Sequence, residues 1–190
     1  MQKKGETFEI GPPKPPGLRK TPSFFGPIKR AYFSPFVLVY GTQGDSAATE
    51  VNLHHARVQA QQWWRRANGR VDILPDTEVT SETVEQYNLI LFGRPETNAI
   101  TARVHRDLPI LIGAGRVALG DRVIEGEGIG VQFIYPNPLN PTKFILVHGG
   151  TDPEGEERST LFGTLYSGAG LCGFFDMDWN LNEKLMYSKK

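Results

Sequence analysis

Cysteine is almost absent from this 190-residue sequence. The single Cys172 excludes an internal disulfide and a cysteine-rich metal site. Neither charge sign is in excess, because 21 Lys and Arg residues balance 21 Asp and Glu residues. This balance argues against a nucleic-acid or anionic-membrane surface, since both need a basic excess. No window approaches the run of roughly 18 apolar residues that a membrane span needs.

The length allows one domain with a substantial core and is too short for two ordinary ones. The opening residues, MQKKGETFEIGPPKPPGLRK, are basic but contain no apolar stretch, so we predict no signal peptide in them. Any export signal would have to lie on a longer precursor. The cellular location therefore stays open, with export of a parent protein among the alternatives.

Prolines set the first part of the chain apart from the rest. Seven of them fall between Gly11 and Pro35, where they remove backbone donors and prevent a long helix. We predict an extended connector over residues 1–34 and a single α/β domain over 35–190. Part of this connector is too apolar for a solvated linker and is expected to bury its rings along a surface. Its apolar residues are Phe24, Phe25, Ile28, Tyr32 and Phe33.

Strand and helix patterns alternate after the connector. Strands are predicted at 36–40, 71–76 and 88–93, and helices at 46–67, 80–86 and 97–107. Such an order implies a parallel sheet with right-handed crossovers. Asp45 or Ser46 can cap the first helix, and Asn68-Gly69 stops it.

The second half of the sequence adds antiparallel signals. Gly120-Asp121 between two short β-branched runs predicts a hairpin. Strands are expected at 130–135 and 143–148. The loop between them contains three prolines, which are expected to end both strands. A last helix is expected over 156–167 and an edge strand within 173–179. The predicted fold is a three-layer, flavodoxin-like or Rossmann-like, mostly parallel sheet with an added antiparallel hairpin region.

The first predicted helix has an apolar stripe at helical spacing. The stripe consists of Leu53, Ala56, Ala60, Trp63, Trp64 and Ala67. His54 and His55 fall on the side away from Trp63 and Trp64, so we expect both histidines to face solvent or a partner. Adjacent histidines point in different directions and are poorly placed to chelate one metal.

Three loops follow buried strands, at 41–46, 93–98 and 148–156. Because the carboxyl ends of parallel strands share one edge, we expect these loops to converge on a polar crevice. The candidate crevice residues are Thr42, Gln43, Asp45, Ser46, Arg94, Asn98, His148 and Thr151.

The first of these loops, in GTQGDSAAT, loosely resembles the loop in which flavodoxins hold the flavin phosphate. Asp45 opposes that interpretation, because two unit charges about 4 Å apart at an effective dielectric near 20 repel by about 4 kcal/mol. A capping aspartate also satisfies the amides that a phosphate would use. A capped turn is therefore favoured over a phosphate cradle, and we predict no cofactor.

Candidates for nucleophilic catalysis are few. Ser167 in GTLYSGAG has Leu165 and Ala169 where the G-x-S-x-G elbow needs glycine. His148 is the one histidine in a plausible catalytic location, with Asp152 nearby in sequence, although a strand-end histidine is more often a hydrogen-bonded structural residue. No metal-ligand spacing is present in the sequence.

Four blocks of the sequence carry a family resemblance. They are GPIKRAYFSPFVLVYGT, YNLILFGRPETNAI, GDRVIEGEGIGVQFIYPNPLNPTKFILVHGG and FFDMDW. Between about Gly26 and Trp179 the chain resembles a domain at the C-terminal end of bacterial prolyl-oligopeptidase-like α/β-hydrolases. In such proteins the catalytic serine, histidine and acid belong to the separate hydrolase domain, so no triad residue is carried onto this sequence.

The resemblance implies a non-catalytic accessory or interaction domain that packs on an α/β-hydrolase domain or subunit of esterase or peptidase type. The charge balance argues against a nucleic-acid or membrane partner. Two alternatives remain at this point: a small-molecule domain that binds flavin or nucleotide through the three loops, and an independent serine hydrolase that uses Ser167 and His148.

Overall fold

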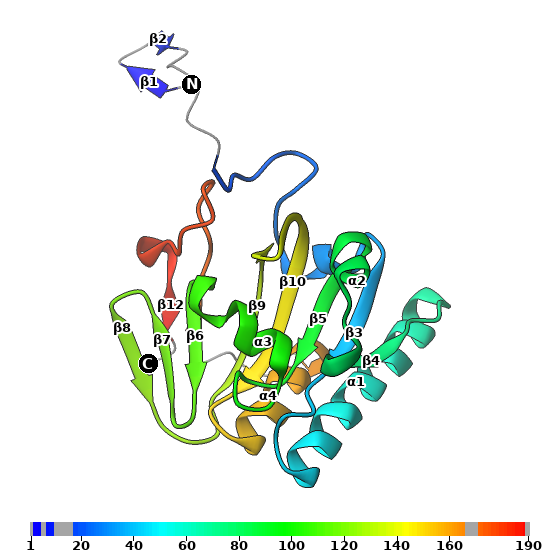
Figure 1. The fold of residues 1–190 in the computed structure, drawn as a ribbon. Coiled ribbons are helices and arrows are strands. Elements are labelled where there is room, and N and C mark those ends of the chain that lie inside the picture. The colour runs from blue at the N-terminus through cyan, green and yellow to red at the C-terminus, as the bar shows by residue number, and fades with distance from the viewer. Residues whose placement is uncertain (1, 5–6, 10–16, 166–170, 189–190) are drawn as a thin grey trace.

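The computed structural model describes residues 2–4, 7–9, 17–165 and 171–188 (Figure 1). The strands are β1 (Gln2–Lys4), β2 (Thr7–Glu9), β3 (Phe36–Tyr40), β4 (Ile73–Pro75), β5 (Asn88–Phe92), β6 (Ile110–Gly113), β7 (Arg116–Leu119), β8 (Arg122–Glu125), β9 (Gly130–Asn137), β10 (Asn140–Gly150), β11 (Leu171–Cys172) and β12 (Tyr187–Ser188). The helices are α1 (Ser46–Ala67), α2 (Ser81–Gln86), α3 (Ala99–Val104) and α4 (Pro153–Leu165). Short 3-10 helices cover Ile28–Tyr32, Asp76–Glu78, His105–Asp107 and Glu183–Leu185.

The main sheet has five strands in the order β4-β3-β5-β10-β9. The first four strands of this order run parallel, and β9 pairs antiparallel with β10. A separate antiparallel sheet contains β6, β7 and β8, and its β7–β8 turn lies at the predicted Gly120-Asp121 hairpin. The predicted α/β fold, mostly parallel with an antiparallel addition, is confirmed.

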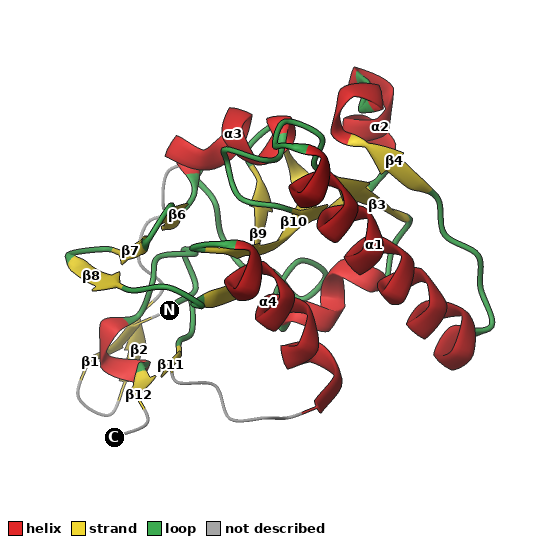
Figure 2. Cartoon of the chain, turned by 90° about the horizontal axis from the view of Figure 1, so that it is seen from below, coloured by secondary structure: helices red, strands yellow, loops and turns green. Residues whose placement is uncertain are grey.

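Helices cover both faces of the main sheet. Figure 2 shows α1 and α4 side by side on one face, with α2 and α3 on the other. Because alternate residues of a strand point to opposite faces, each strand contributes to two cores. One core, which also includes the β6–β8 sheet, contains Val37, Val39, Leu89, Leu91, Ile145 and Val147, and the other contains Leu38, Ala56, Ile90, Phe92, Leu146 and Trp179.

Helix α1 has the bounds that its sequence predicted. Asp45 Oδ1 accepts a hydrogen bond from the Ala48 amide at 2.8 Å, and Asn68 ends the helix in the left-handed region with φ 51°. The predicted apolar stripe is partly wrong, because Trp64 is 57% exposed. Its neighbour Trp63 instead packs edge-on against Phe36 at 4.9 Å, so the buried face turns away from Trp64.

The connector packs on the domain through some of its rings. Phe24 stacks on Phe144 of β10 with centroids 4.0 Å apart, and Tyr32 packs edge-on against Phe36. Burial of the connector rings is confirmed for these two residues. Phe25 and Phe33 are 39% and 62% exposed, so the expectation fails for them.

Two predictions about the later strands are wrong. β9 continues through Pro136 and β10 includes Pro141, although their prolines were expected to end both strands. Proline is tolerated here because β9 is an edge strand and because the pairing register shifts between Asn140 and Phe144. Residues 173–179 form no strand; Phe175 makes an isolated bridge with Leu181.

The last helix also begins earlier than predicted, at Pro153, and ends at Leu165. No helix in the described ranges is long and apolar enough to cross a membrane.

Candidate functional site

The three loops that follow β3, β5 and β10 lie together at the carboxyl edge of the sheet. The Gln43 amide donates to the Thr97 carbonyl at 3.0 Å, and the Gly93 amide donates to the His148 carbonyl at 2.9 Å. These bonds join the first loop to the second and the second to the end of β10. The predicted meeting of the loops at one edge is therefore confirmed, and the polar crevice between them stays a prediction.

Glycine allows these loops to touch one another directly. A Cβ at Gly41 would lie 2.1 Å from the Thr97 carbonyl oxygen, and a Cβ at Gly150 would lie 2.2 Å from the Glu156 nitrogen. Real Cβ atoms do not approach other atoms so closely, so any side chain at either position would push the loops apart. Gly41, one of the glycines that suggested a phosphate loop, thus serves a contact between loops.

Asp76 also lies at this edge, although the sequence did not predict it among the candidate residues. It follows β4, is 3% exposed, and joins the first loop to the start of α3. Its Oδ1 accepts from the Thr42 hydroxyl at 2.6 Å and from the Thr42 amide at 3.2 Å. Its Oδ2 accepts from the Ala99 amide at 2.6 Å and from Gln43 Nε2 at 3.4 Å. Thr42 and the exposed Gln43 therefore both donate to Asp76.

We expect Asp76→Ala to lower the free energy of unfolding by about 2 kcal/mol, because it leaves the Thr42 and Ala99 amides without their acceptor. Urea unfolding at pH 7 measures this loss. The matched control is Asp45→Ala, which removes one exposed helix cap and should cost about 1 kcal/mol. A smaller loss for Asp76→Ala than for Asp45→Ala would contradict the structural role assigned to Asp76.

Arg94 and Glu156 form a mostly buried ion pair between the second loop and α4. Arg94 Nη1 lies 3.1 Å from Glu156 Oε1, and the same oxygen accepts from the Arg94 amide at 3.2 Å and from Thr97 Oγ1 at 3.4 Å. Glu156 is 2% exposed, and its Oε2 has no hydrogen-bond partner among the described residues. Burial raises the pKa of Glu156, while its bonds with Arg94 act in the opposite direction.

The first loop is a capped turn. The Asp45 carboxylate accepts from the Ala48 amide, so it occupies part of the helix terminus that a phosphate would need. Ser46 is exposed and begins α1. The geometry agrees with the favoured interpretation of GTQGDS as a turn.

Asn98 has a structural role as the N-cap of α3. It is completely buried, and its Oδ1 accepts from the amides of Ile100 and Thr101 at 2.9 and 3.0 Å. Its Nδ2 donates to the Phe92 carbonyl at 3.0 Å. These contacts use both ends of the amide within the protein.

His148 is buried beneath α1 and α4. It is 2% exposed and stacks on Phe92 with centroids 4.9 Å apart and an interplanar angle of 13°. Gln132 Nε2 lies 3.4 Å from each ring nitrogen. Burial lowers the pKa of His148 to about 4; a hydrogen bond with the Ser159 backbone opposes this, and nearby His55 adds to it. The ring is therefore neutral at pH 7 and enclosed by protein.

The expectation that both adjacent histidines face solvent or a partner is wrong for His55. His54 is exposed, but His55 is 6% exposed and belongs to the buried face of α1 together with Asn52 and Ala56. Burial lowers the pKa of His55 to about 4. The predicted apolar stripe included Ala56 but missed the other two, because Asn52 and His55 are polar.

Thr151 and Asp152 fix the start of α4. Thr151 is 2% exposed, and its hydroxyl accepts from the Ile129 amide at 3.1 Å. The Asp152 carboxylate accepts from the amides of Gly128 and Gly155 at 2.6 and 2.7 Å, and these bonds lower its pKa. Asp152 thus holds backbone in place.

Ser167 lies outside the described residues. Within the described ranges, no three His, Cys, Asp or Glu side chains gather in a group that could hold a metal ion. The candidate residues other than the exposed Ser46 therefore take part in bonds or contacts that build the edge of the sheet.

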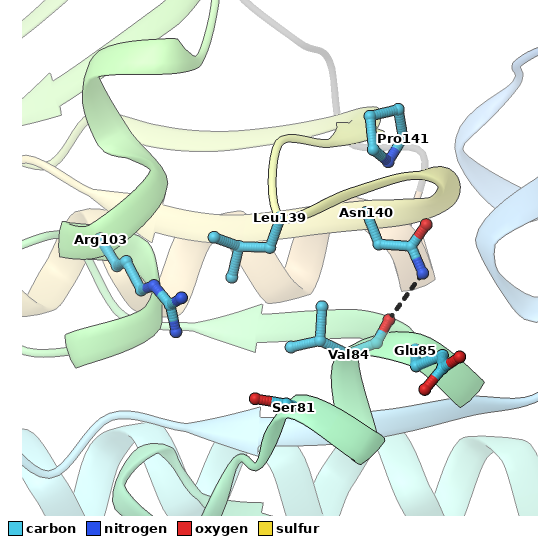
Figure 3. A pocket seen from close by; sticks show the side chains of 7 residues that line it. All are labelled: Ser81, Val84, Glu85, Arg103, Leu139, Asn140 and Pro141. Atoms are coloured by element: carbon cyan, nitrogen blue, oxygen red, sulfur yellow. Dashed lines mark hydrogen bonds between the residues drawn. The ribbon is translucent and has the colours of Figure 1, made fainter.

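Two open grooves lie at the opposite edge, near the amino ends of the strands. The first, of about 370 Å³, is lined by residues of α2, α3, the β9–β10 turn and the start of β10 (Figure 3). Asn140 Nδ2 donates there to the Val84 carbonyl at 3.2 Å, and Arg103 and Glu85 supply the charges. The second, of about 550 Å³, is lined by five aromatic residues together with Arg70, Asp72 and three others. Neither groove contains a predicted crevice residue.

The fold defines an α/β protein with a flavodoxin-like or Rossmann-like, mostly parallel sheet. A scan against protein-family models found no match, and a search of curated proteins found none.

Proposed function

We propose that this chain is a non-catalytic accessory or interaction domain that packs on an α/β-hydrolase domain or subunit of esterase or peptidase type. The resemblance of its sequence blocks to a domain of prolyl-oligopeptidase-like proteins supports the choice of partner. The main support for an interaction role is that two adjoining segments expose large apolar side chains.

These side chains are Leu18, Phe174, Met177 and Leu185, which are 38%, 61%, 55% and 57% exposed; we call them the terminal surface. The segments that carry them bond to each other. The Lys20 amide donates to the Met177 carbonyl at 2.7 Å, and Lys20 Nζ donates to the Phe175 carbonyl at 2.5 Å. Large exposed apolar side chains on adjoining segments favour a protein contact.

The surroundings of His148 and Asp152 at the carboxyl edge support a non-catalytic role. A general base must reach the proton that it removes, within about 3 Å or through one water. His148 is enclosed and stacked on Phe92, and Asp152 is bonded to Gly128 and Gly155. His148 is therefore not placed to act on a substrate from solvent, and the amide bonds that lower the pKa of Asp152 make that carboxylate a weaker base.

We expect the purified chain to show no covalent labelling by a fluorophosphonate probe, which reacts with activated serines. The reason is that an activated serine needs a base within hydrogen-bond reach and preorganised oxyanion donors. Intact-mass spectrometry after incubation with the probe measures the labelling. A serine hydrolase of known activity serves as the positive control. Near-stoichiometric labelling that maps to Ser167 would show that the chain is itself a hydrolase.

A further inference from the structure

Acidic residues are absent from a long stretch of the sequence that covers most of α1. Between Glu50 and Asp72 the chain carries arginines but no aspartate or glutamate. These arginines are Arg57, Arg65, Arg66 and Arg70. This stretch is therefore basic, although the chain as a whole has no net charge.

Part of this basic stretch lies on the solvent-facing side of α1. From Arg57 onward, one group of exposed side chains falls within an arc of about 100°, since each helical residue advances by about 100°. The group consists of Arg57, Gln61, Trp64 and Arg65, and we call it the α1 surface. Arg66 lies on another side of the helix, and Arg70 lies beyond its end. Figure 2 shows the C-terminal end of α1 at the periphery of the molecule, away from α4.

The two arginines of the α1 surface form no ion pair or hydrogen bond through their side chains with any described residue. Exposed helices are commonly stabilised by an acid and a base three or four positions apart, and neither arginine has an acid at that spacing. The nearest acid on this side is Glu50, about two turns before Arg57. Arg65 lies in the last turn, where a cation favours the helix dipole, but Arg57 lies in the middle of the helix. Both guanidinium groups are therefore open to an external acceptor.

Arginines beside an exposed tryptophan match a segment that carries carboxylates around an apolar side chain. Arginine binds carboxylates through paired N–H donors. Trp64 is 57% exposed, and tryptophan and arginine are enriched among the residues that contribute most to protein binding. Along the helix axis Arg57 and Arg65 are about 12 Å apart, at about 1.5 Å per residue. An extended segment spans that distance with about four residues, at about 3.3 Å each.

The neutrality of the chain favours a short acidic segment over nucleic acid or an anionic membrane. Charges act over about 10 Å at about 0.1 M salt, so a short segment responds chiefly to the α1 surface. A nucleic acid or a membrane extends further across the protein and also meets its acidic residues. Such partners need a basic excess, which this chain does not have.

We propose that the α1 surface binds an acidic segment of a protein partner, with carboxylates on Arg57 and Arg65 and an apolar side chain on Trp64. The proposal goes beyond the hydrolase interaction and shares no residue with the terminal surface. Either proposal can fail while the other holds.

The test measures binding of a fluorescent acidic peptide to the full chain by anisotropy in about 50 mM salt. The peptide has a pair of glutamates at each end and three leucines between them, so that glutamates four positions apart enclose the leucines. Arg57→Glu with Arg65→Glu reverses the charge of the α1 surface. Arg106→Glu with Arg122→Glu is the matched control, because both residues are exposed and the net charge of the chain changes equally.

Saturable binding to the wild type is expected with a Kd below about 100 µM. The α1-surface variant should bind at least about tenfold more weakly, and the control variant should stay within about threefold of the wild type. The same peptide with glutamine in place of glutamate should not bind. Absence of saturable binding, or equal weakening by the two variants, would overturn the proposal.

Trp64→Ser separates the apolar contact from the charges. It should weaken binding of the leucine peptide at least about fivefold and leave unchanged the binding of a peptide with serines in place of the leucines. Equal effects on the two peptides would contradict the role of Trp64.

A competition experiment tests the class of partner. Oligothymidylate and vesicles that contain phosphatidylserine are offered against the bound peptide at equal charge concentration. Neither is expected to displace it as well as unlabelled peptide does. Stronger displacement by either one would assign the α1 surface to phosphate-bearing partners and overturn the proposal.

Discussion

Replacing Arg94 by methionine is expected to lower the free energy of unfolding by about 3–5 kcal/mol. The substitution keeps much of the side-chain volume but leaves Glu156 as a charge in a site that is 2% exposed. The variant should recover part of its stability as the pH falls, because Glu156 then becomes neutral. Urea unfolding at pH 7 and pH 5 measures both effects.

A double variant separates the charge from the packing. Arg94→Met with Glu156→Gln removes both charges and should recover most of the lost stability, since breaking one partner of a buried pair costs more than replacing both. Glu154→Gln on the same helix is the control; Glu154 is 63% exposed, and its loss should cost less than about 1 kcal/mol. A double variant no more stable than Arg94→Met would contradict this account of the pair.

Stability is also expected to fall in acid because of His148. Burial holds its pKa at about 4 in the folded protein, against 6.5 for an exposed histidine. Above pH 6.5 both states carry a neutral ring, so the group adds no pH dependence there. Between pH 6.5 and 4 the unfolded chain binds a proton that the folded protein does not, and about 3 kcal/mol of stability is lost.

His148→Gln tests this prediction, because glutamine does not titrate. The variant should show a flatter loss of stability between pH 6.5 and 4.5 than the wild type, whatever its stability at pH 7. His54→Gln is the control, since His54 is exposed and next to the buried His55. Equal slopes for wild type and His148→Gln would show that His148 is protonated in the folded protein.

Local sequence patterns were enough to predict the main architecture. The run Phe36–Tyr40, the cap at Asp45 and the stop at Asn68 fixed β3 and α1, because each depends on neighbours in the chain. The meeting of the three loops followed from the order of strands and helices alone, since parallel strands place their carboxyl ends at one edge.

Contacts between distant residues set the features that the sequence did not predict. Asp76 is structural because Thr42 and Ala99 lie beside it, 34 and 23 positions away. His55 is buried because α4 packs beside α1. The sequence of α1 alone does not predict this contact. The strand passes through Pro136 because β9 has a partner on one side only.

Contacts between distant residues also explain why the candidate crevice residues have structural roles. Glycine, hydroxyl and charged groups after buried strands are typical of a ligand crevice, and the same groups also satisfy one another when loops meet. Arg94, Asn98 and Thr151 are all used in this second way. The sequence predicted the correct edge for these residues. It did not predict that their hydrogen-bond partners are other residues of the protein.

The most direct test of the accessory role is the affinity of this chain for the α/β-hydrolase polypeptide encoded in frame with it or beside it, measured by isothermal titration calorimetry. The account predicts a saturable complex that Phe174→Ser with Met177→Ser weakens at least about tenfold, and that Phe33→Ser, which changes another exposed ring, leaves unchanged. Absence of binding, or equal binding by the terminal-surface variant and the wild type, would contradict it.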